Sequence, residues 1–386
     1  MNYLAIFALA TSSFVIGASE FIVVGLLSDI AISLGVSDSS AGMIVFAYAM
    51  SVVVGGPILA VLTFKMSRKA TLLFFCFLFV VGNFLCAIAP TYWTLIGARI
   101  ITGLAHGVFF GIASVVATSL ASKEKQGFAI SLVFMGLTLA NVLGVPLGAL
   151  IGHYYGWRMP FYIIFFCGLI SLLAIFLFLP NNLRMPRGKV MREFMILKRF
   201  NVQMPLLLSI ITSTSLFLLV TYVKPILLQV TQAGAESIVP IMMIFGIGLS
   251  IGSILGGRLA NQRVILNIMI VMALSVLIQF GMFFVLHHLY GFGVFILLWG
   301  SFAFALCPML QMLIVLQAKA APNLASTFNQ SAFNLGNSIG AALGAILISD
   351  KVAMPLEWLP LASGSVMILG IIGTFSLFVY VRRQYR

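Results

Sequence analysis

The sequence predicts an all-α integral membrane protein in which twelve transmembrane helices form two pseudo-symmetric six-helix bundles. Three observations support this fold class. Of the 386 residues, 62% are hydrophobic and 8% are charged, with a mean hydropathy of +1.18, far more apolar than a soluble core requires. Apolar runs of about 20 residues, the length that crosses a bilayer, follow one another along the chain. Lysine and arginine are concentrated in alternate short connections between these runs, which is the pattern that orients membrane helices.

The N-terminal half contains six of the predicted spans, each an apolar run between polar or helix-breaking residues. The first run has no basic n-region and no small-residue cleavage site, so we expect it to be retained as a helix. We assign residues 1–180 to an N-terminal bundle with spans at 4–28, 41–64, 71–89, 92–119, 127–152 and 159–179.

The longest connection is also the most basic stretch of the chain. Pro186 and Gly188 interrupt helix formation there, and the residues from Met191 to Phe200 suit an amphipathic interfacial helix. We therefore assign 181–202 to a cytoplasmic linker and 203–386 to a C-terminal bundle, with spans at 203–228, 236–258, 264–286, 291–317, 323–348 and 358–381.

The fifth and eleventh predicted spans share a ridge of small residues spaced four apart. Such a ridge lets two helix backbones approach closely, and its presence at the same place in both halves indicates an internal repeat, as in many transporters. Ordinary packing without moving parts remains the alternative. The ridges are Gly136, Ala140, Gly144, Gly148 and Gly152 in one span and Ala332, Gly336, Gly340 and Gly344 in the other. Gly144, Pro146, Gly148, Gly336 and Gly340 are the candidate hinge positions.

The formal charge of +13 reflects membrane topology, because the basic residues lie in short loops and form no soluble patch suited to nucleic acid. The opposite loops hold only Arg158 and Lys351. We expect a multi-pass protein of the cell membrane with both termini cytoplasmic. The predicted cytoplasmic residues are Lys65, Arg68, Lys69, Lys123, Lys125, Arg184, Arg187, Lys189, Arg192, Lys198, Arg199, Arg258, Arg263, Lys319, Arg382, Arg383 and Arg386.

Several motifs, in order along the chain, resemble those of the major facilitator superfamily, specifically its twelve-helix drug:proton antiporters and arabinose-efflux-type permeases. The segment from Arg99 to Gly107 (RIITGLAHG) is similar to the fourth-helix motif, and Gly136 to Gly152 to the fifth-helix antiporter motif. Gly17 to Phe21 (GASEF), Gly156 to Arg158 (GWR) and Phe328 to Gly336 also match. The resemblance covers essentially the whole length and implies proton-driven export by alternating access.

The loop after the second span departs from this family pattern. Phe64 stands where the family usually has an aspartate, and Asn261 stands at the equivalent place in the second half. The family's charge-relay latch between helices is therefore doubtful here. Arg68 and Lys69 remain, and we interpret them mainly as cytoplasmic anchors with some phosphate contact, and as candidates for a conformational role.

Glu20 is the strongest candidate for a functional residue, because it is the acid expected deepest in hydrocarbon, in the middle of the first apolar run. Burial favours the uncharged acid, so Glu20 is expected to exchange a proton near physiological pH. The alternative is a structural carboxylate hydrogen-bonded within the bundle.

Arg99 and His106 complete the predicted proton-coupling site. Arg99, Gly103, His106 and Phe110 share one helix face, which places Arg99 and His106 about two turns, roughly 10 Å, apart. Arg99 keeps its charge and is expected to influence the protonation of Glu20, while a histidine such as His106 is suited to relaying protons. Alternatively, Arg99 only ties helices together and His106 is a packing residue.

The predicted substrate cavity combines one aromatic residue with polar side chains in apolar spans, each of which either contacts cargo or bonds another helix. Lys224 is expected near the outer end of its span, where it either extends to the interface or faces the cavity and disfavours cations. The cavity candidates are Phe110, Asn141, Tyr222, Lys224, Gln311, Asn329 and Asn334.

The sequence therefore predicts a proton-coupled exporter of small lipophilic compounds or drugs, monomeric and without a cofactor, whose partners are cargo, protons and the bilayer. There is no phosphate-binding loop of the ATPase type and no catalytic cluster, so we expect no enzyme activity. The four cysteines lie in apolar runs and predict neither disulfides nor a metal site. The alternatives are a narrow-specificity sugar, nucleoside or metabolite exporter and a non-transporting membrane sensor.

Overall fold

The computed structural model describes residues 2–183, 190–349 and 351–384. Within these ranges the chain is helical with connecting turns and contains no strand, which confirms the all-α prediction. Twelve helical segments of the described chain are long and apolar enough to cross a membrane, which confirms the predicted number of spans. The predicted helix breakers Pro186 and Gly188 lie outside the described residues, as do Arg184, Arg187 and Lys189.

The helices of the N-terminal half follow the predicted runs closely. Their order is α1 (Tyr3–Ile22), η1 (Val23–Gly25), α2 (Leu27–Leu34), α3 (Asp38–Met50), η2 (Ser51–Gly55), α4 (Gly56–Leu62), α5 (Arg68–Ile88), α6 (Tyr92–Ser119), η3 (Lys123–Lys125), α7 (Gln126–Tyr155) and α8 (Met159–Phe178).

The C-terminal half repeats this arrangement after a short helix in the linker. Its elements are α9 (Val190–Leu197), α10 (Phe200–Val220), α11 (Val223–Pro225), η4 (Ile226–Val230), η5 (Ala235–Ser237), α12 (Ile238–Leu259), α13 (Val264–Phe283), α14 (Leu289–Gln317), α15 (Pro322–Ile348), η6 (Leu356–Trp358) and α16 (Leu359–Gln384).

Four expected helices differ from the prediction. The first span ends as an α-helix at Ile22, because β-branched residues and Gly25 lower helix propensity there, and α2 follows as a separate helix. The second span contains the π turn η2 just before Pro57, whose missing N–H removes one helical hydrogen bond. The expected linker helix ends at Leu197 and not at Phe200, because Arg199 is extended and a new helix begins after it. The seventh span, expected at 203–228, is interrupted after Val220 and continues as α11 and the π turn η4, because Pro225 has no N–H to donate to Thr221 O.

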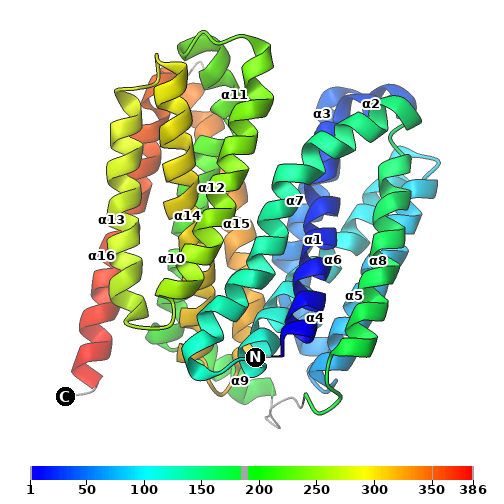
Figure 1. Ribbon diagram of the computed structural model, residues 1–386, viewed down its shortest axis with the longest axis vertical. Coiled ribbons are helices and arrows are strands. Elements are labelled where there is room, and N and C mark those ends of the chain that lie inside the picture. The colour runs from blue at the N-terminus through cyan, green and yellow to red at the C-terminus, as the bar shows by residue number, and fades with distance from the viewer. Residues whose placement is uncertain (1, 184–189, 350, 385–386) are drawn as a thin grey trace.

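The two halves of the chain form two bundles that stand side by side (Figure 1). One core cluster draws its buried residues from positions 5–183, and a second draws almost all of its buried residues from positions 208–377. In each bundle the small-residue ridge packs against the first helix. A Cβ on Gly136 would lie 2.2 Å from Ala10 O, and one on Gly340 would lie 2.4 Å from Thr214 O. The ridges therefore allow α7 to contact α1 and α15 to contact α10.

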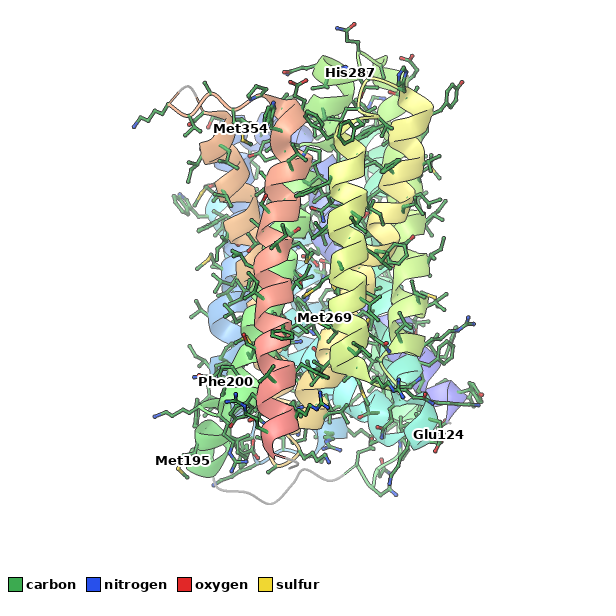
Figure 2. All side chains as sticks on the ribbon, turned by 90° about the vertical axis from the view of Figure 1, so that its left-hand side faces the viewer. Glu124, Met195, Phe200, Met269, His287 and Met354 are labelled. Atoms are coloured by element: carbon green, nitrogen blue, oxygen red, sulfur yellow. The ribbon has the colours of Figure 1, made fainter. Side chains whose placement is uncertain are left out.

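Both termini and α9 lie at the same end of the molecule (Figure 1). From the side, Glu124, Met195 and Phe200 are near this end, and His287 and Met354 are near the other (Figure 2). We call the first the terminal end. There, Ile196 and Leu197 of α9 pack in a small cluster with Ala60 of the N-terminal bundle and Leu324 of the C-terminal bundle. Helix α9 therefore covers the junction of the two bundles.

The hydrogen bonds that cross between the bundles all lie toward the terminal end. Among the described residues they are Arg68 Nε to Asn323 Oδ1 (3.2 Å), Gly127 N to Asn261 Oδ1 (2.8 Å), Ser253 Oγ to Ser131 O (2.7 Å), Ser331 Oγ to Val52 O (3.0 Å) and a Thr138–Ser250 hydroxyl pair (3.0 Å). The bundles are thus held together at the terminal end, and their ribbons diverge toward the other (Figure 1).

Candidate functional site

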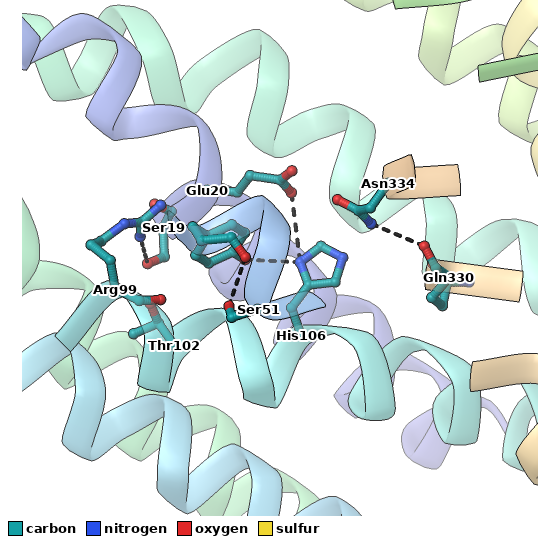
Figure 3. A network of polar contacts seen from close by, with 9 residues as sticks. Ser19, Glu20, Ser51, Arg99, Thr102, His106, Gln330 and Asn334 are labelled. Carbon is teal, nitrogen blue, oxygen red and sulfur yellow. Dashed lines mark hydrogen bonds and ion pairs between the residues drawn. The ribbon is translucent and has the colours of Figure 1, made fainter. Parts of the chain in front are cut away.

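Glu20 of α1 and His106 of α6 meet inside the N-terminal bundle (Figure 3). The carboxylate oxygen Oε2 lies 3.6 Å from Nδ1 of the imidazole, which is an ion-pair distance and too long for a good hydrogen bond. His106 is 3% exposed and Glu20 is 20% exposed. The carboxylate is therefore the member of this pair that a cargo molecule or water reaches first.

Tyr48 of α3 contacts the same imidazole nitrogen. Its hydroxyl oxygen lies 2.8 Å from Nδ1 of His106, and the two rings meet edge to face with centroids 5.8 Å apart. A ring nitrogen carries at most one proton. When Nδ1 is protonated it donates toward one of the two oxygens, and when it is not, it accepts from the tyrosine hydroxyl. Glu20 and Tyr48 therefore compete for one position.

Arg99 lies on the other side of Tyr48 and is fully buried. Its Nη1 donates to the carbonyl oxygen and hydroxyl of Ser19 at 3.0 and 3.3 Å, and its guanidinium carbon lies 4.2 Å from the centre of the Tyr48 ring. Among the described residues no carboxylate lies within ion-pair distance of Arg99, and its Nε and Nη2 have no hydrogen-bond partner. The charge of Arg99 thus acts on Glu20 across a low-dielectric gap and through Tyr48.

The surrounding helices fix this cluster in place. Ser19 donates its hydroxyl proton to Asn83 Oδ1 at 2.7 Å, and Asn83 is anchored to Phe79 O at 2.9 Å. A Cβ on Gly103 would lie 2.6 Å from Tyr48 O, so only glycine allows α6 to approach α3 this closely. The glycine of the fourth-helix motif therefore brings His106 within reach of Tyr48.

An aromatic layer continues from His106 into the C-terminal bundle. Phe110 is fully buried, with its ring 4.6 Å from His106 and 6.4 Å from Phe134. Phe134 in turn contacts Phe304 at 6.3 Å and Phe333 at 6.4 Å, both from the other bundle. Phe110 thus belongs to an apolar contact between bundles in this conformation and does not line open space.

The predicted amides of the C-terminal bundle form a network of their own. The side-chain oxygen of Gln311 accepts from Asn329 at 2.7 Å and from Gln330 at 3.1 Å, and its amide donates to Ser326. Asn329 also accepts from Ser209 at 2.7 Å. Each of these side chains is hydrogen-bonded within the C-terminal bundle, as the helix-bonding alternative for Gln311 and Asn329 expects.

Asn334 differs from these amides because, among the described residues, its side chain donates only to its own helix, to Gln330 O at 3.1 Å. It projects from α15 toward the side of the site where Glu20 and His106 lie (Figure 3). Asn334 is therefore the one C-terminal cavity candidate that the structure brings near the Glu20 cluster.

The remaining cavity candidates lie apart from this cluster. Tyr222 donates its hydroxyl proton to Ala341 O at 3.1 Å, and its ring packs where a Cβ on Gly344 would sit. Lys224 is exposed on α11, and Asn141 is half-buried on α7.

Arg68 and Lys69 have different roles in this structure. Arg68 bonds Asn323 of the opposite bundle. Lys69 donates to the carbonyl oxygens of Phe176 and Leu179, both at 2.7 Å, and so satisfies the end of α8 within its own bundle. Of the candidate hinge residues, Gly144 and Gly148 pack against Ala18 and Ile22, Gly336 and Gly340 pack against α10, and Pro146 lies within α7.

Sequence reasoning missed Tyr48, Ser19 and Asn83. Each is a common polar residue within an apolar run, and its importance depends on which helix it faces. The only available signal was that Ser19 precedes Glu20 in the GASEF motif.

The described part of the chain has twelve apolar helices in two bundles, with ionisable side chains buried in one of them, an arrangement typical of a membrane transporter. Residues 9–345 match the family described as Major Facilitator Superfamily, and the chain therefore belongs to that family. It is 40% identical over 349 residues to "Inner membrane transport protein YdhP" of Escherichia coli (strain K12), which covers 90% of each chain. It is 29% identical over 366 residues to "Probable sugar efflux transporter" of Helicobacter pylori (strain J99), covering 95% of this chain and 93% of the relative.

The fold is also that of solved transporters. The proton:xylose symporter XylE superposes with a TM-score of 0.77 at 14% identity, covering 97% of this chain and 95% of the other. The protein is therefore a multi-pass membrane transporter and not an enzyme.

Proposed function

We propose that this protein is a proton-coupled secondary exporter, similar to the drug:proton antiporters and arabinose-efflux permeases, that moves small lipophilic compounds or drugs out of the cell. The contact of Glu20 with His106, close to the buried charge of Arg99, carries the proposal. Ionisable groups inside membrane spans are costly and usually serve transport.

In the proposed cycle, protonation of Glu20 changes both its charge and its hold on His106. As a carboxylate, Glu20 offsets the charge of Arg99, attracts a proton on Nδ1 of His106 and attracts cationic cargo. When it is protonated, these attractions weaken, and the hydroxyl of Tyr48 donates to Nδ1 in its place. Cargo and proton therefore favour different states of one site, which is the requirement for exchange.

The energy for export would come from the proton gradient, since inward movement of one charge gains about 2.3 kcal/mol per 100 mV. In the proposed orientation the terminal end is cytoplasmic, so the contacts between the bundles at this end correspond to an outward-facing state. Residues 1–180 and 203–386 would rock as two bodies in a monomer, with Gly144, Pro146, Gly148, Gly336 and Gly340 at the pivoting contacts.

The proposed cargo is lipophilic because the aromatic layer of Phe110, Phe134, Phe304 and Phe333 adjoins the site. A sugar or related metabolite is the second candidate, favoured by the name of the Helicobacter pylori relative. A sensor that binds cargo without moving it is the third.

Reconstituted protein tests the proposal. In proteoliposomes with an imposed pH gradient, wild type should move cargo uphill, and Glu20→Gln should lower that rate by roughly 10²-fold, the scale of a lost proton-transfer group. The exposed acid Glu236 provides a matched control, since Glu236→Gln should transport normally. Equal uphill transport by Glu20→Gln would contradict proton coupling here, and binding without flux by the wild type would favour a sensor. Lipophilic dyes and sugars tested side by side separate the two cargo classes.

A further inference from the structure

A groove on the outer surface of the C-terminal bundle lies apart from the Glu20 cluster. It has a volume of about 540 Å³ and runs between the start of α10 and the last turns of α16. Figure 2 shows Phe200 beside α16 near the terminal end. The groove is lined by Phe200, Phe375, Ser376, Val379, Tyr380 and Arg383.

The walls of the groove are mostly apolar and lie on the outer surface of two predicted membrane helices. The rings of Phe200 and Tyr380 contact each other at 4.8 Å and join the two helices. Ser376 donates its hydroxyl proton to Ile372 O at 3.0 Å, so this side chain is already satisfied within its helix. Phe375 is 55% exposed and Ile372 is 58% exposed, as expected of side chains that face lipid. The groove therefore suits an acyl chain.

Positive charge is concentrated at the mouth of this groove. Arg383 lines it and Arg382 is its neighbour, while Lys198 and Arg199 immediately precede Phe200; all four are exposed. The nearest acid before Lys198 is Glu193, which is buried on α9, and 370–386 contains no acidic residue. Among the described residues the four cations form no ion pair with an acidic side chain. This end of the helices is where a phosphate group would lie if the groove held a lipid chain.

We propose that this groove is a binding site for an anionic phospholipid of the phosphatidylglycerol type. One acyl chain lies along α16 between Phe375 and Val379, and the phosphate binds Arg383 with support from Arg199. Guanidinium groups bind phosphate oxygens through paired charge-assisted hydrogen bonds. A zwitterionic headgroup also carries a cation, which repels the arginines and weakens this binding. The site depends on an apolar wall and a basic mouth together.

Native mass spectrometry of protein released from nanodiscs tests this site. The nanodiscs contain phosphatidylglycerol and phosphatidylcholine with the same acyl chains in equal amounts. Wild type should retain phosphatidylglycerol several-fold over phosphatidylcholine. Arg383→Ala should lose this preference by removing the charge, and Ser376→Trp should lose it by filling the groove while every cation stays in place.

Two matched variants control for general effects. Arg258→Ala removes an exposed cation from the end of α12, and Ser365→Trp adds the same bulk at an exposed position of α16 about three turns from Ser376, outside the residues that line the groove. Both should retain lipid as wild type does. Equal retention of the two lipids by wild type, or unchanged preference in both Arg383→Ala and Ser376→Trp, would overturn the proposal. Displacement of the bound lipid by soluble glycerol phosphate would also overturn it, because the apolar wall would then be unnecessary.

Discussion

At the scale of single residues, the site depends on the sharing of Nδ1 of His106 between two oxygens. Tyr48 lies closer, at 2.8 Å, and Glu20 lies at 3.6 Å. The tyrosine ring also lies under the guanidinium of Arg99. We therefore interpret Tyr48 as a positioning residue that links the fixed charge of Arg99 to the histidine and sets which oxygen the imidazole faces.

The substitution Tyr48→Phe removes the hydroxyl group and keeps the aromatic ring, so it tests the two contacts of Tyr48 separately. The contact with Arg99 should persist, so unfolding should become easier by only about 1 kcal/mol, the value of one hydrogen bond. Without the hydroxyl, Nδ1 should be free to face Glu20 in both protonation states, and the pH at which transport is half-maximal should shift. Transport measured across a pH series, together with thermal unfolding, checks both effects.

Tyr92→Phe is the matched control for this variant. The hydroxyl of Tyr92 donates to Ser40 O at 2.8 Å, far from the imidazole, so its loss should affect stability alone. An unchanged pH profile for Tyr48→Phe would remove Tyr48 from the coupling site.

The ionisable residues of the site could be predicted from sequence, whereas their arrangement could not. Glu20, Arg99 and His106 were conspicuous because charged or titratable groups are rare in apolar runs. Helical spacing placed Arg99 and His106 on one face of α6. It gave no information that α3 would insert Tyr48 against both, because that contact depends on how helices pack across the bundle.

At the scale of elements, α6 packs closely against two other helices through two glycines that are eight residues apart. Gly103 allows α3 to approach α6 closely, and Gly111 allows the same for α15 of the other bundle. A Cβ on Gly111 would lie 2.7 Å from Thr327 Cα. The same helix that carries Arg99 and His106 therefore also contacts the opposite bundle. A movement of α6 caused by a change at Arg99 or His106 would therefore directly alter its contact with α15.

Gly111→Ala should force α6 and α15 apart. Overpacking of this kind costs about 1–3 kcal/mol, and the cost falls only on the state in which the two helices touch. The population should shift toward opening at the terminal end, measured as a longer distance between spin labels placed on the two bundles. Gly97→Ala on the same helix meets nothing within 4 Å and should leave the distance unchanged. Equal distances in both variants would show that this contact does not hold the bundles together.

Helix α9 is a second element of interest, because its docking on the bundles depends on the protonation of Glu193. Glu193 is buried on the face that carries Ile196 and Leu197, and the ring of Phe194 lies 6.3 Å from Phe328. Burial raises the pKa of Glu193 from 4.5 to about 7. The docked helix therefore favours the protonated acid.

The sign of the pH effect on α9 follows from this shift. Docking gains a contribution from neutral Glu193 that is fully present below about pH 4.5 and is lost as the pH rises through about 7. A nitroxide at Met195→Cys should become more mobile over that rise, and Glu193→Gln should abolish the change. Glu236→Gln, an exposed acid outside the linker, should preserve it. Mobility that does not vary with pH in the native linker would contradict the expected docking.

The elements themselves were largely predictable. Apolar length and charged loops predicted twelve spans, and the described residues contain twelve helices that are long and apolar enough to cross a membrane. The deviations occur where local chemistry interrupts a long helix, at Gly25, before Pro57, at Arg199 and next to Pro225. Sequence predicts that Pro57 perturbs its helix, but whether the result is a kink or a π turn depends on packing against α6 and α15.

At the scale of the whole molecule, one end is closed by a few polar contacts and the apolar layer above them. Asn261 stands where the family resemblance implies an acid, so a charge-relay latch would lack its carboxylate at this position. The structure supplies an uncharged contact at the same place, since Asn261 Oδ1 accepts from the backbone N–H of Gly127 at the start of α7. The sequence alone could not indicate which end is closed, because one chain populates both states of a transport cycle.

Asn261 thus caps a helix of the opposite bundle, and its removal should loosen the terminal end. Loss of a cap costs about 1 kcal/mol, or roughly a fivefold change in population. With the native cysteines replaced, a cysteine at the fully buried Thr327 should react with a maleimide roughly fivefold faster in Asn261→Ala. Asn261→Asp should slow the reaction, because a negative charge is stabilised at a helix N-terminus. Asn267→Ala is the matched control, since Asn267 bonds Leu259 O and Gln262 O within its own bundle. Similar labelling rates in Asn261→Ala and Asn267→Ala would mean that the Asn261 cap does not hold the terminal end closed.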